Sequence, residues 1–211
     1  LKNQAALIAI PDEELAKLIS HETQQTLDKL KQKRGTSVGA YYVQLEHERL
    51  TALLFDWLAQ EKTRPPFKVI AIEQEVKVTF AGLPLTLRID RVDELATGEL
   101  LLVDYKTGNP KLASWQGERM DEPQLPLYAV TASGDIRAIA FAQVNAKAMQ
   151  WIGTGELQVM HEGIDLVKQG WQEQIHQWQN NLQQLAQDFI QGDARVDMKN
   201  TLTAQYAEDL L

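Results

Sequence analysis

The chain has 211 residues, of which 44% are hydrophobic, and a formal net charge of −8 at pH 7. This length suits one well-packed domain, and the acidic balance argues against a protein that holds nucleic acid through a broad basic surface. The absence of cysteine excludes disulfides, thiolate zinc sites and iron–sulfur clusters within these residues. No apolar run is long enough to span a bilayer, and we expect a cytoplasmic protein without membrane contact.

The chain is expected to form a single domain over residues 1–211. Within it we expect a helical part over 1–66, a catalytic sheet core over 67–150 and a long C-terminal helix within 160–192. Because the sequence begins at Leu1 rather than methionine, we expect a fragment of a longer protein.

Two helices are predicted before the sheet. Acidic residues follow Pro11, where they favour the positive end of a helix dipole, and the apolar spacing predicts a helix to about Lys33. Apolar residues three and four apart predict a second helix over Tyr41–Gln60. Pro65 and Pro66 end it, because proline lacks the amide hydrogen that the helix needs.

The apolar period changes to two after Phe67, which predicts strands. The elements expected in chain order are strands over Lys68–Phe80, Leu83–Val92 and Glu99–Lys106, a helix over Pro123–Ala132, a strand over Ile136–Val144 and a helix over Ile164–Ile190. The predicted fold is α/β, with a mixed central sheet of three hairpin-linked strands flanked by helices.

Two short turns set the register of these strands. If Ala81 and Gly82 form a two-residue loop, Glu73 lies opposite Asp90. If the second hairpin is centred on Thr97, Asp90 lies opposite Asp104. Lys106 then shares the face of Asp104, and cross-strand neighbours are only ~5 Å apart. We therefore predict three carboxylates and a lysine in one patch.

The opposite face of the three strands is predicted to be apolar. A slip of one residue in either hairpin would mix the two faces. The residues expected on this apolar face are Val76, Val78, Phe80, Leu83, Leu85, Leu87, Ile89, Leu101 and Val103.

Carboxylates that repel one another are stabilised by a cation, and hard ions such as Mg²⁺ prefer oxygen ligands. A bound metal can activate water, and Lys106 can stabilise charge that develops on a phosphate. The patch therefore suits phosphodiester hydrolysis. Two alternatives are a simple solvated face and a carboxylate-pair glycosidase, although the latter has no use for Lys106.

Three segments carry a family resemblance: Ile89-Asp90-Arg91-Val92-Asp93, Val103-Asp104-Tyr105-Lys106-Thr107-Gly108 and Gln124-Leu125-Pro126-Leu127-Tyr128. With the preceding glutamate strand, they resemble the RecB-like and AddB-like nucleases of the PD-(D/E)XK superfamily. The resemblance covers roughly Val69 to Val130. It implies a restriction-endonuclease-like core and a metal-dependent exonuclease module that acts on DNA. It also implies a helicase partner in repair or recombination.

The resemblance also assigns roles to residues. It implies that Asp90 and Asp104 bind Mg²⁺ or Mn²⁺ together with the Tyr105 carbonyl, and that Lys106 is catalytic. Glu73 would be a direct or outer ligand, with Glu75 as the substitute. The residues expected to position DNA or the lysine are Gln124, Tyr128 and Arg119; the alternatives are a packing role for Tyr128 and an exposed loop position for Arg119.

The sequence departs from the family pattern at two places. Val43 stands where RecB-like enzymes carry a histidine on an upstream helix, and His21 and His47 are the available substitutes. The stretch from Gly192 to Leu211 has no cysteine, so it lacks the iron–sulfur ligands of AddB-like members. The missing histidine leaves a second possibility, which is a catalytically silent domain that guides DNA or supports a larger assembly.

Overall fold

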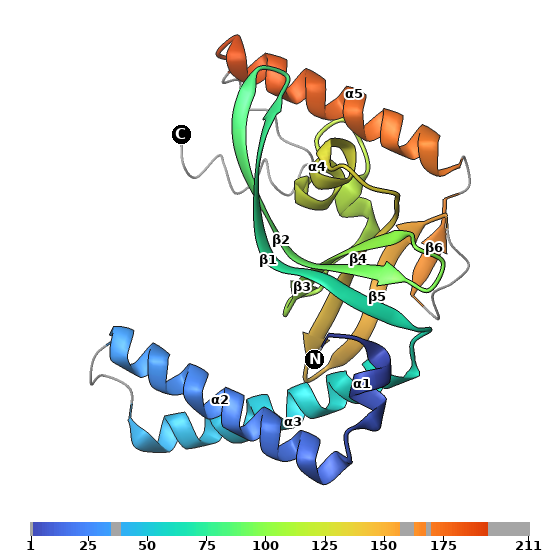
Figure 1. Cartoon of the computed structure of the whole chain (residues 1–211). Coiled ribbons are helices and arrows are strands. Elements are labelled where there is room, and N and C mark those ends of the chain that lie inside the picture. The colour runs from blue at the N-terminus through green and yellow to red at the C-terminus, as the bar shows by residue number, and fades with distance from the viewer. Residues whose placement is uncertain (1, 35–38, 157–162, 168–169, 194–211) are drawn as a thin grey trace.

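One six-stranded mixed sheet, with helices packed on both faces, organises the chain (Figure 1). The computed structural model describes residues 2–34, 39–156, 163–167 and 170–193. The sheet has the order β1-β2-β3-β4-β5-β6, with β3–β4 and β5–β6 parallel and the other neighbours antiparallel. The predicted α/β class with three hairpin-linked strands is thus confirmed.

The elements have the following bounds. The strands are β1 (Phe67–Phe80), β2 (Leu83–Leu95), β3 (Leu100–Lys106), β4 (Ile136–Asn145), β5 (Ala148–Gly155) and β6 (Ile164–Leu166). The helices are α1 (Gln4–Ala9), α2 (Asp12–Arg34), α3 (Ala40–Thr63), the 3-10 helix η1 (Leu112–Trp115), α4 (Gln124–Thr131) and α5 (Trp171–Ile190).

The two predicted N-terminal helices form a hairpin that extends away from the sheet (Figure 1). Three acidic residues occupy the first turn of α2, as its dipole favours. Near the sheet, Leu15 and Ile19 of α2 bury against Leu7 and pack on Phe55 of α3. Within the part of the chain that the structure describes, no helix is long and apolar enough to cross a membrane.

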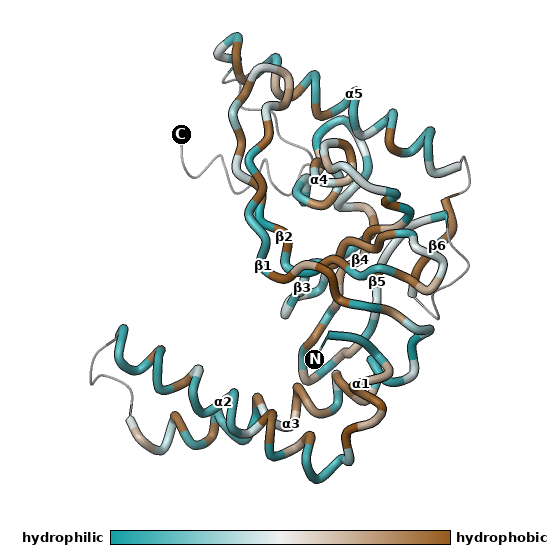
Figure 2. Tube along the Cα trace, viewed as in Figure 1, coloured by the Kyte–Doolittle hydropathy of each residue, from teal (hydrophilic) through white to brown (hydrophobic). Residues whose placement is uncertain are grey.

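Apolar residues cover both faces of the sheet. Figure 2 shows them concentrated along the central strands, while hydrophilic residues dominate α2 and α5. On the α4 and α5 side, Leu102 and Phe141 pack with Trp171 and Trp178, so these tryptophans are core residues. On the α3 side, the cluster contains Trp57, Phe67, Leu101, Val103 and Trp151.

Both predicted hairpin registers are confirmed. Phe80 pairs with Leu83, and the ladder continues to Ile72 opposite Arg91. Arg91 in turn pairs with Val103, and the same antiparallel register places Asp104 opposite Asp90. Short turns determine register in this way because they leave no room for a slip.

The predicted single apolar face is wrong. Leu101 and Val103 belong to the α3-side cluster, whereas Leu87 and Ile89 belong to the α4/α5-side cluster. Ile89 and Val92 both join the latter cluster, so strict alternation breaks at Asp90 and Arg91. A two-stranded ribbon twists strongly, and β1 also has a register shift between Val69 and Ala71.

The structure adds elements that the sequence pattern concealed. Residues 164–166 form β6 instead of the start of a helix, and α5 begins only after Gly170, which has a φ of 92°. Strand β5 was missed because glycine is a poor strand former. A side chain at Gly153 would lie 2.7 Å from the Ile139 carbonyl oxygen and 2.8 Å from the Ala140 Cβ. The glycine therefore allows β5 to pack closely on β4.

Candidate active site

Asp90 and Asp104 lie side by side at the end of the β2–β3 ladder. The backbone N–H of Tyr105 donates a hydrogen bond of 2.9 Å to Oδ2 of Asp90, so the first carboxylate is held beside the residue that follows the second. Asp104 also lies beside Phe141 of β4 in the parallel ladder. The predicted neighbourhood of these two aspartates is therefore present.

Asp104 is a buried carboxylate, with 6% of the residue exposed. Its Oδ2 lies 3.1 Å from Nζ of Lys106, but this buried oxygen accepts no hydrogen bond from any residue that the structure describes. Burial raises the pKa of Asp104, Lys106 opposes the rise, and the Asp90 and Glu122 carboxylates add to it. The positive charge of Lys106 therefore does not fully offset the cost of burying the ionised Asp104 carboxylate.

Lys106 lies between two carboxylates. Its Nζ donates a 3.0 Å hydrogen bond to Glu122, lies 3.1 Å from Asp104, and sits 5.6 Å from the centre of the Phe141 ring. Burial alone would lower the pKa of Lys106, but these two carboxylates raise it above its ordinary value. The ammonium group is therefore held in its charged form and in one place.

Glu122 was not found by reasoning from sequence. It reaches Lys106 because the chain after β3 passes through η1 and returns just before α4, and no periodic pattern predicts such a return. The one available signal was its position two residues before Gln124 in the motif of the α4 helix.

The predicted convergence of three carboxylates is wrong. Glu73 lies opposite Asp90 in the register, but its φ is 51° and its carboxylate pairs with the exposed Arg88. Nowhere in the described ranges do three histidine, cysteine, aspartate or glutamate side chains lie close enough to hold one ion. Glu75, the predicted substitute, is exposed on β1. A left-handed residue in the middle of β1 turns the side chain away from regular alternation.

The residues predicted to position substrate have different surroundings. Gln124 donates to the backbone carbonyl of Arg88, two residues before Asp90. Tyr128 is buried among the apolar residues of α4 and the sheet, and this burial raises the pKa of its hydroxyl. Arg119 is exposed in the loop before α4. Gln124 thus connects α4 to β2, whereas Tyr128 packs in the core between α4 and the sheet.

A buried charge network lies behind the site, on the α3 side of the sheet. Arg91 donates to Asp93 at 2.6 and 2.9 Å and to Glu61 at 3.2 and 2.9 Å. Arg64 donates to Glu61 at 2.9 Å and to Asp93 at 2.8 Å. The two arginines and two acids balance in charge, which buried ions require. Asp93 therefore has a structural role in this network.

The network extends to the residue between Asp104 and Lys106. Arg91 donates a 2.9 Å hydrogen bond to the hydroxyl of Tyr105, whose ring also meets Trp57 edge-on. Burial raises the pKa of Tyr105 despite the opposing charge of Arg91. Burial would lower the pKa of Arg91, but Tyr105, Asp93 and Glu61 raise it. The Arg91 side chain thus links β2 to Tyr105 of β3 on the α3 side of the sheet.

Mg²⁺ fits the two aspartates. This ion is usually bound through one or two protein carboxylates together with water and substrate phosphates, so a third carboxylate is not required. The buried Asp104 Oδ2 has the Lys106 ammonium at 3.1 Å and lies beside Asp90, whose charge adds to the rise in the pKa of Asp104. A cation there would offset the repulsion that both carboxylates now exert on each other.

The two candidate histidines are bound within the helical hairpin. Nε2 of His47 lies 3.2 Å from Ser20 Oγ and 3.0 Å from the Ser20 carbonyl oxygen, between α2 and α3. Nε2 of His21 lies 2.7 Å from the side-chain amide of Gln25 on the surface of α2. Both therefore have partners inside their own helices or between them.

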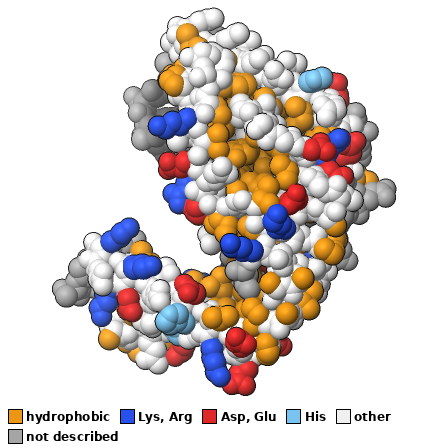
Figure 3. Space-filling model, in the orientation of Figure 1, with side chains coloured by type: hydrophobic (Ala, Val, Ile, Leu, Met, Phe, Trp, Pro, Cys, Tyr) orange, Lys and Arg blue, Asp and Glu red, His pale blue; other side chains and the backbone are white. Residues whose placement is uncertain are grey.

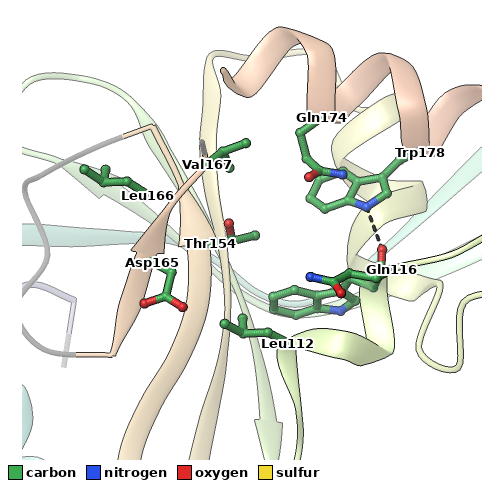
Figure 4. A pocket seen from close by; sticks show the side chains of 9 residues that line it. Leu112, Gln116, Thr154, Asp165, Leu166, Val167, Gln174 and Trp178 are labelled. Atoms are coloured by element: carbon green, nitrogen blue, oxygen red, sulfur yellow. Dashed lines mark hydrogen bonds between the residues drawn. The ribbon is translucent and has the colours of Figure 1, made fainter. Parts of the chain in front are cut away.

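A cavity of about 560 Å³ lies apart from these residues, between η1, β6 and α5 (Figure 4). Trp178 donates to the Trp115 carbonyl at its wall, and Asp165 and Gln174 supply polar groups. None of the predicted site residues lines this cavity. Trp115 and Trp151 are buried, so they act in packing.

Comparison with known proteins agrees with this geometry. A family model described as the PD-(D/E)XK nuclease superfamily matches residues 5–201. Nucleases of this superfamily typically use divalent metals such as Mg²⁺. The six-stranded mixed sheet flanked by helices is consistent with its restriction-endonuclease-like fold. No curated protein matches the chain.

Proposed function

The chain belongs to the PD-(D/E)XK nuclease superfamily, and on this premise we propose that it is a metal-dependent deoxyribonuclease of the RecB-like branch. The single observation that carries the proposal is the arrangement of Asp90, Asp104 and Lys106 at one end of the β2–β3 ladder. Two adjacent carboxylates with a fixed ammonium group suit hydrolysis of a phosphodiester.

In this proposal Asp90 and Asp104 hold Mg²⁺ or Mn²⁺, with the Tyr105 carbonyl as a further ligand. When bound, the metal would activate a water molecule and neutralise charge on the scissile phosphate. Lys106, fixed by Asp104 and Glu122, donates to a phosphate oxygen as negative charge develops. Asp90 is oriented by the Tyr105 amide and so keeps its geometry without rearrangement.

Residues around this centre would either contact the DNA or hold the catalytic elements in position. Gln124 links α4 to the Asp90 strand and is proposed to orient this strand toward the DNA. Arg119 is proposed as a phosphate contact in the exposed loop, and Tyr128 as a support for α4. Glu73 is proposed only as an outer contributor, since its carboxylate is engaged by Arg88.

We further propose an exonuclease module that works with a helicase in DNA repair or recombination. The support is the likeness of three motifs to RecB-like proteins and the net charge of −8, which suits a module whose DNA is delivered by a partner. The domain would span residues 1–211 as one unit.

The test is Lys106→Ala assayed with Mn²⁺ and Mg²⁺ on linear single- and double-stranded DNA. We expect cleavage to fall by about 100-fold or more, as for loss of a group that stabilises transition-state charge. Lys77→Ala, which removes an exposed lysine from β1, is the matched control and should cleave normally. Undiminished cleavage by Lys106→Ala at unchanged thermal stability would contradict the assignment.

A catalytically silent domain is the second candidate, and Val43 at the position of the family histidine favours it. Isothermal titration with Mn²⁺ separates the two. The nuclease proposal expects binding that disappears in Asp90→Asn and Asp104→Asn. A wild-type chain that neither binds Mn²⁺ nor cleaves DNA would support the silent domain.

A further inference from the structure

We propose that the distal end of the α2–α3 hairpin binds a single-stranded segment of nucleic acid. Lys29, Lys31 and Lys33 would contact phosphates, and Tyr41 and Tyr42 would stack on bases. The choice of DNA as the probe rests on the proposed function, but the surface is inferred from its own chemistry.

The first observation is a local reversal of charge. The chain carries 29 acidic and 21 basic residues, yet the segment from Lys29 to Arg34 reads Lys-Leu-Lys-Gln-Lys-Arg and contains no acid. The three lysine side chains are exposed, and no ion pair involves them within the described residues. Unpaired lysines on an acidic protein concentrate affinity for phosphate at one place.

The second observation is a pair of exposed aromatic rings at the start of α3, the helix that follows these lysines. Tyr41 is 74% exposed and Tyr42 is 62% exposed at the start of α3. Lys31 and Tyr42 line one groove between the two helices, together with Leu27 and Leu30. Cations interleaved with accessible rings are the usual surface for single strands, because each base offers a face for stacking.

Helix stability accounts for only part of these side chains. The hairpin is anchored at its other end, where Leu15 and Ile19 are buried, and near its tip Leu27 is the last buried residue of α2 in the described part. Cations in the last turn of α2 complement its dipole, but Lys29 precedes that turn. Glu46, the acid that lines the groove, is already paired with Arg49 at 2.7 Å.

The hairpin also has a suitable place in the molecule. Figure 3 shows a hollow between the α2–α3 hairpin and the rest of the protein, with Lys and Arg side chains gathered on the outer part of the hairpin. A nucleic-acid strand bound at the tip would therefore leave Asp90 and Asp104 accessible to another part of the same nucleic acid. The tip is proposed as an anchor remote from the chemistry.

The first experiment measures binding of a fluorescent oligothymidylate by anisotropy in EDTA, so that cleavage does not contribute. The Lys29→Ala/Lys31→Ala/Lys33→Ala variant should bind at least ten-fold more weakly. Its slope of log K against log salt should fall by about 2, since each lost phosphate contact on a single strand contributes about 0.7. The control Lys2→Ala/Lys68→Ala/Lys77→Ala changes the net charge equally and should bind within two-fold of wild type.

The second experiment tests stacking. Tyr41→Ala/Tyr42→Ala should weaken oligothymidylate binding by about ten-fold or more, whereas Tyr41→Phe/Tyr42→Phe should retain it, because stacking needs the ring and not the hydroxyl. Circular dichroism and melting temperature establish that each variant is folded. The hairpin proposal predicts that a duplex competitor displaces the oligothymidylate poorly.

Three results would overturn the proposal. The first is wild-type affinity and salt slope in the triple lysine variant. The second is unchanged binding in the double alanine variant. The third is self-association in sedimentation that only the tyrosine-to-alanine variant abolishes, which would assign the rings to a protein interface. Because binding is measured without metal, loss of nuclease activity alone does not affect the result.

Discussion

Asp104 is the residue at which burial and charge conflict most clearly. Its carboxylate is buried beside Asp90 and near Glu122, with Lys106 as compensation. A carboxylate whose pKa is raised in the folded state costs stability once it ionises, and this cost grows as pH rises from about 4 through the raised pKa. The cost is therefore present at neutral pH and absent in acid.

We expect Asp104→Asn to raise the melting temperature slightly at pH 7 in the absence of metal, because asparagine carries no charge to desolvate. The difference should vanish near about pH 3, where both proteins are neutral at this position. Scanning calorimetry at the two pH values checks the sign. A variant that is less stable than wild type at pH 7 would contradict the account.

The same variant tests metal binding. Millimolar Mn²⁺ should stabilise the wild type, by about 2.7 kcal/mol when its concentration is 100 times the dissociation constant. Asp104→Asn should show no such shift. If the wild type fails to respond, or the variant retains the full response, the aspartate pair does not bind the ion.

A variant of Glu122 tests whether this residue only positions Lys106 or takes part in the reaction. Glu122→Gln keeps an oxygen that can accept from Lys106, so we expect cleavage to fall by about ten-fold or less, well short of the Lys106→Ala loss. Steady-state rates with Mn²⁺ provide the measurement. A loss as complete as that of Lys106→Ala would assign Glu122 to the reaction itself.

At the scale of elements, the Arg91 network joins the end of α3 to β2 and β3. Asp93 receives hydrogen bonds from both arginines and is fully buried, while its neighbour Glu94 is partly exposed and pairs with Lys68 at 3.4 Å. These adjacent acids on one strand provide a matched comparison between a buried and a surface ion pair.

Asp93→Asn should destabilise the protein by about 3–5 kcal/mol, because it leaves two buried arginines with one fewer counter-charge. Glu94→Gln should change stability by less than about 1 kcal/mol. Urea unfolding of both variants gives the two free energies. Equal effects would show that the network does not depend on burial.

The molecule as a whole consists of a sheet packed on both faces and a hairpin that is anchored at one end. Large buried clusters hold β2, β3 and β4, whereas the tip of the hairpin has a row of exposed apolar residues, including Leu30 and Leu45. Local opening is easier where fewer apolar groups are buried. Stability should therefore decline from the sheet toward the tip.

Hydrogen exchange monitored by mass spectrometry should reveal this gradient. We expect amides in α2 beyond Leu27 to exchange at least roughly ten-fold faster than those in β3 and β4. Peptides around Leu15 should be intermediate, because this residue is buried near the hairpin's attached end. Uniform protection along α2 would contradict the proposed weak tip.

Local sequence predicted α2, α3, α4 and the body of α5, four of the six strands and the two hairpin registers. Turn length and a period of two act over a few residues, so they placed Asp90 next to Asp104 and Lys106 without knowledge of the rest. The roles of these residues stay predictions until variants are assayed.

Only the tertiary structure revealed the features that depend on contacts between segments far apart in the sequence. Glu122 reaches Lys106 across a loop, Glu61 meets Arg91 from another element, and β5 is a strand because its glycines permit close packing on β4. Twist and a left-handed Glu73 turned the predicted third carboxylate toward Arg88. None of these follows from periodicity, because periodicity describes which face a residue occupies on its own element and not which element covers that face.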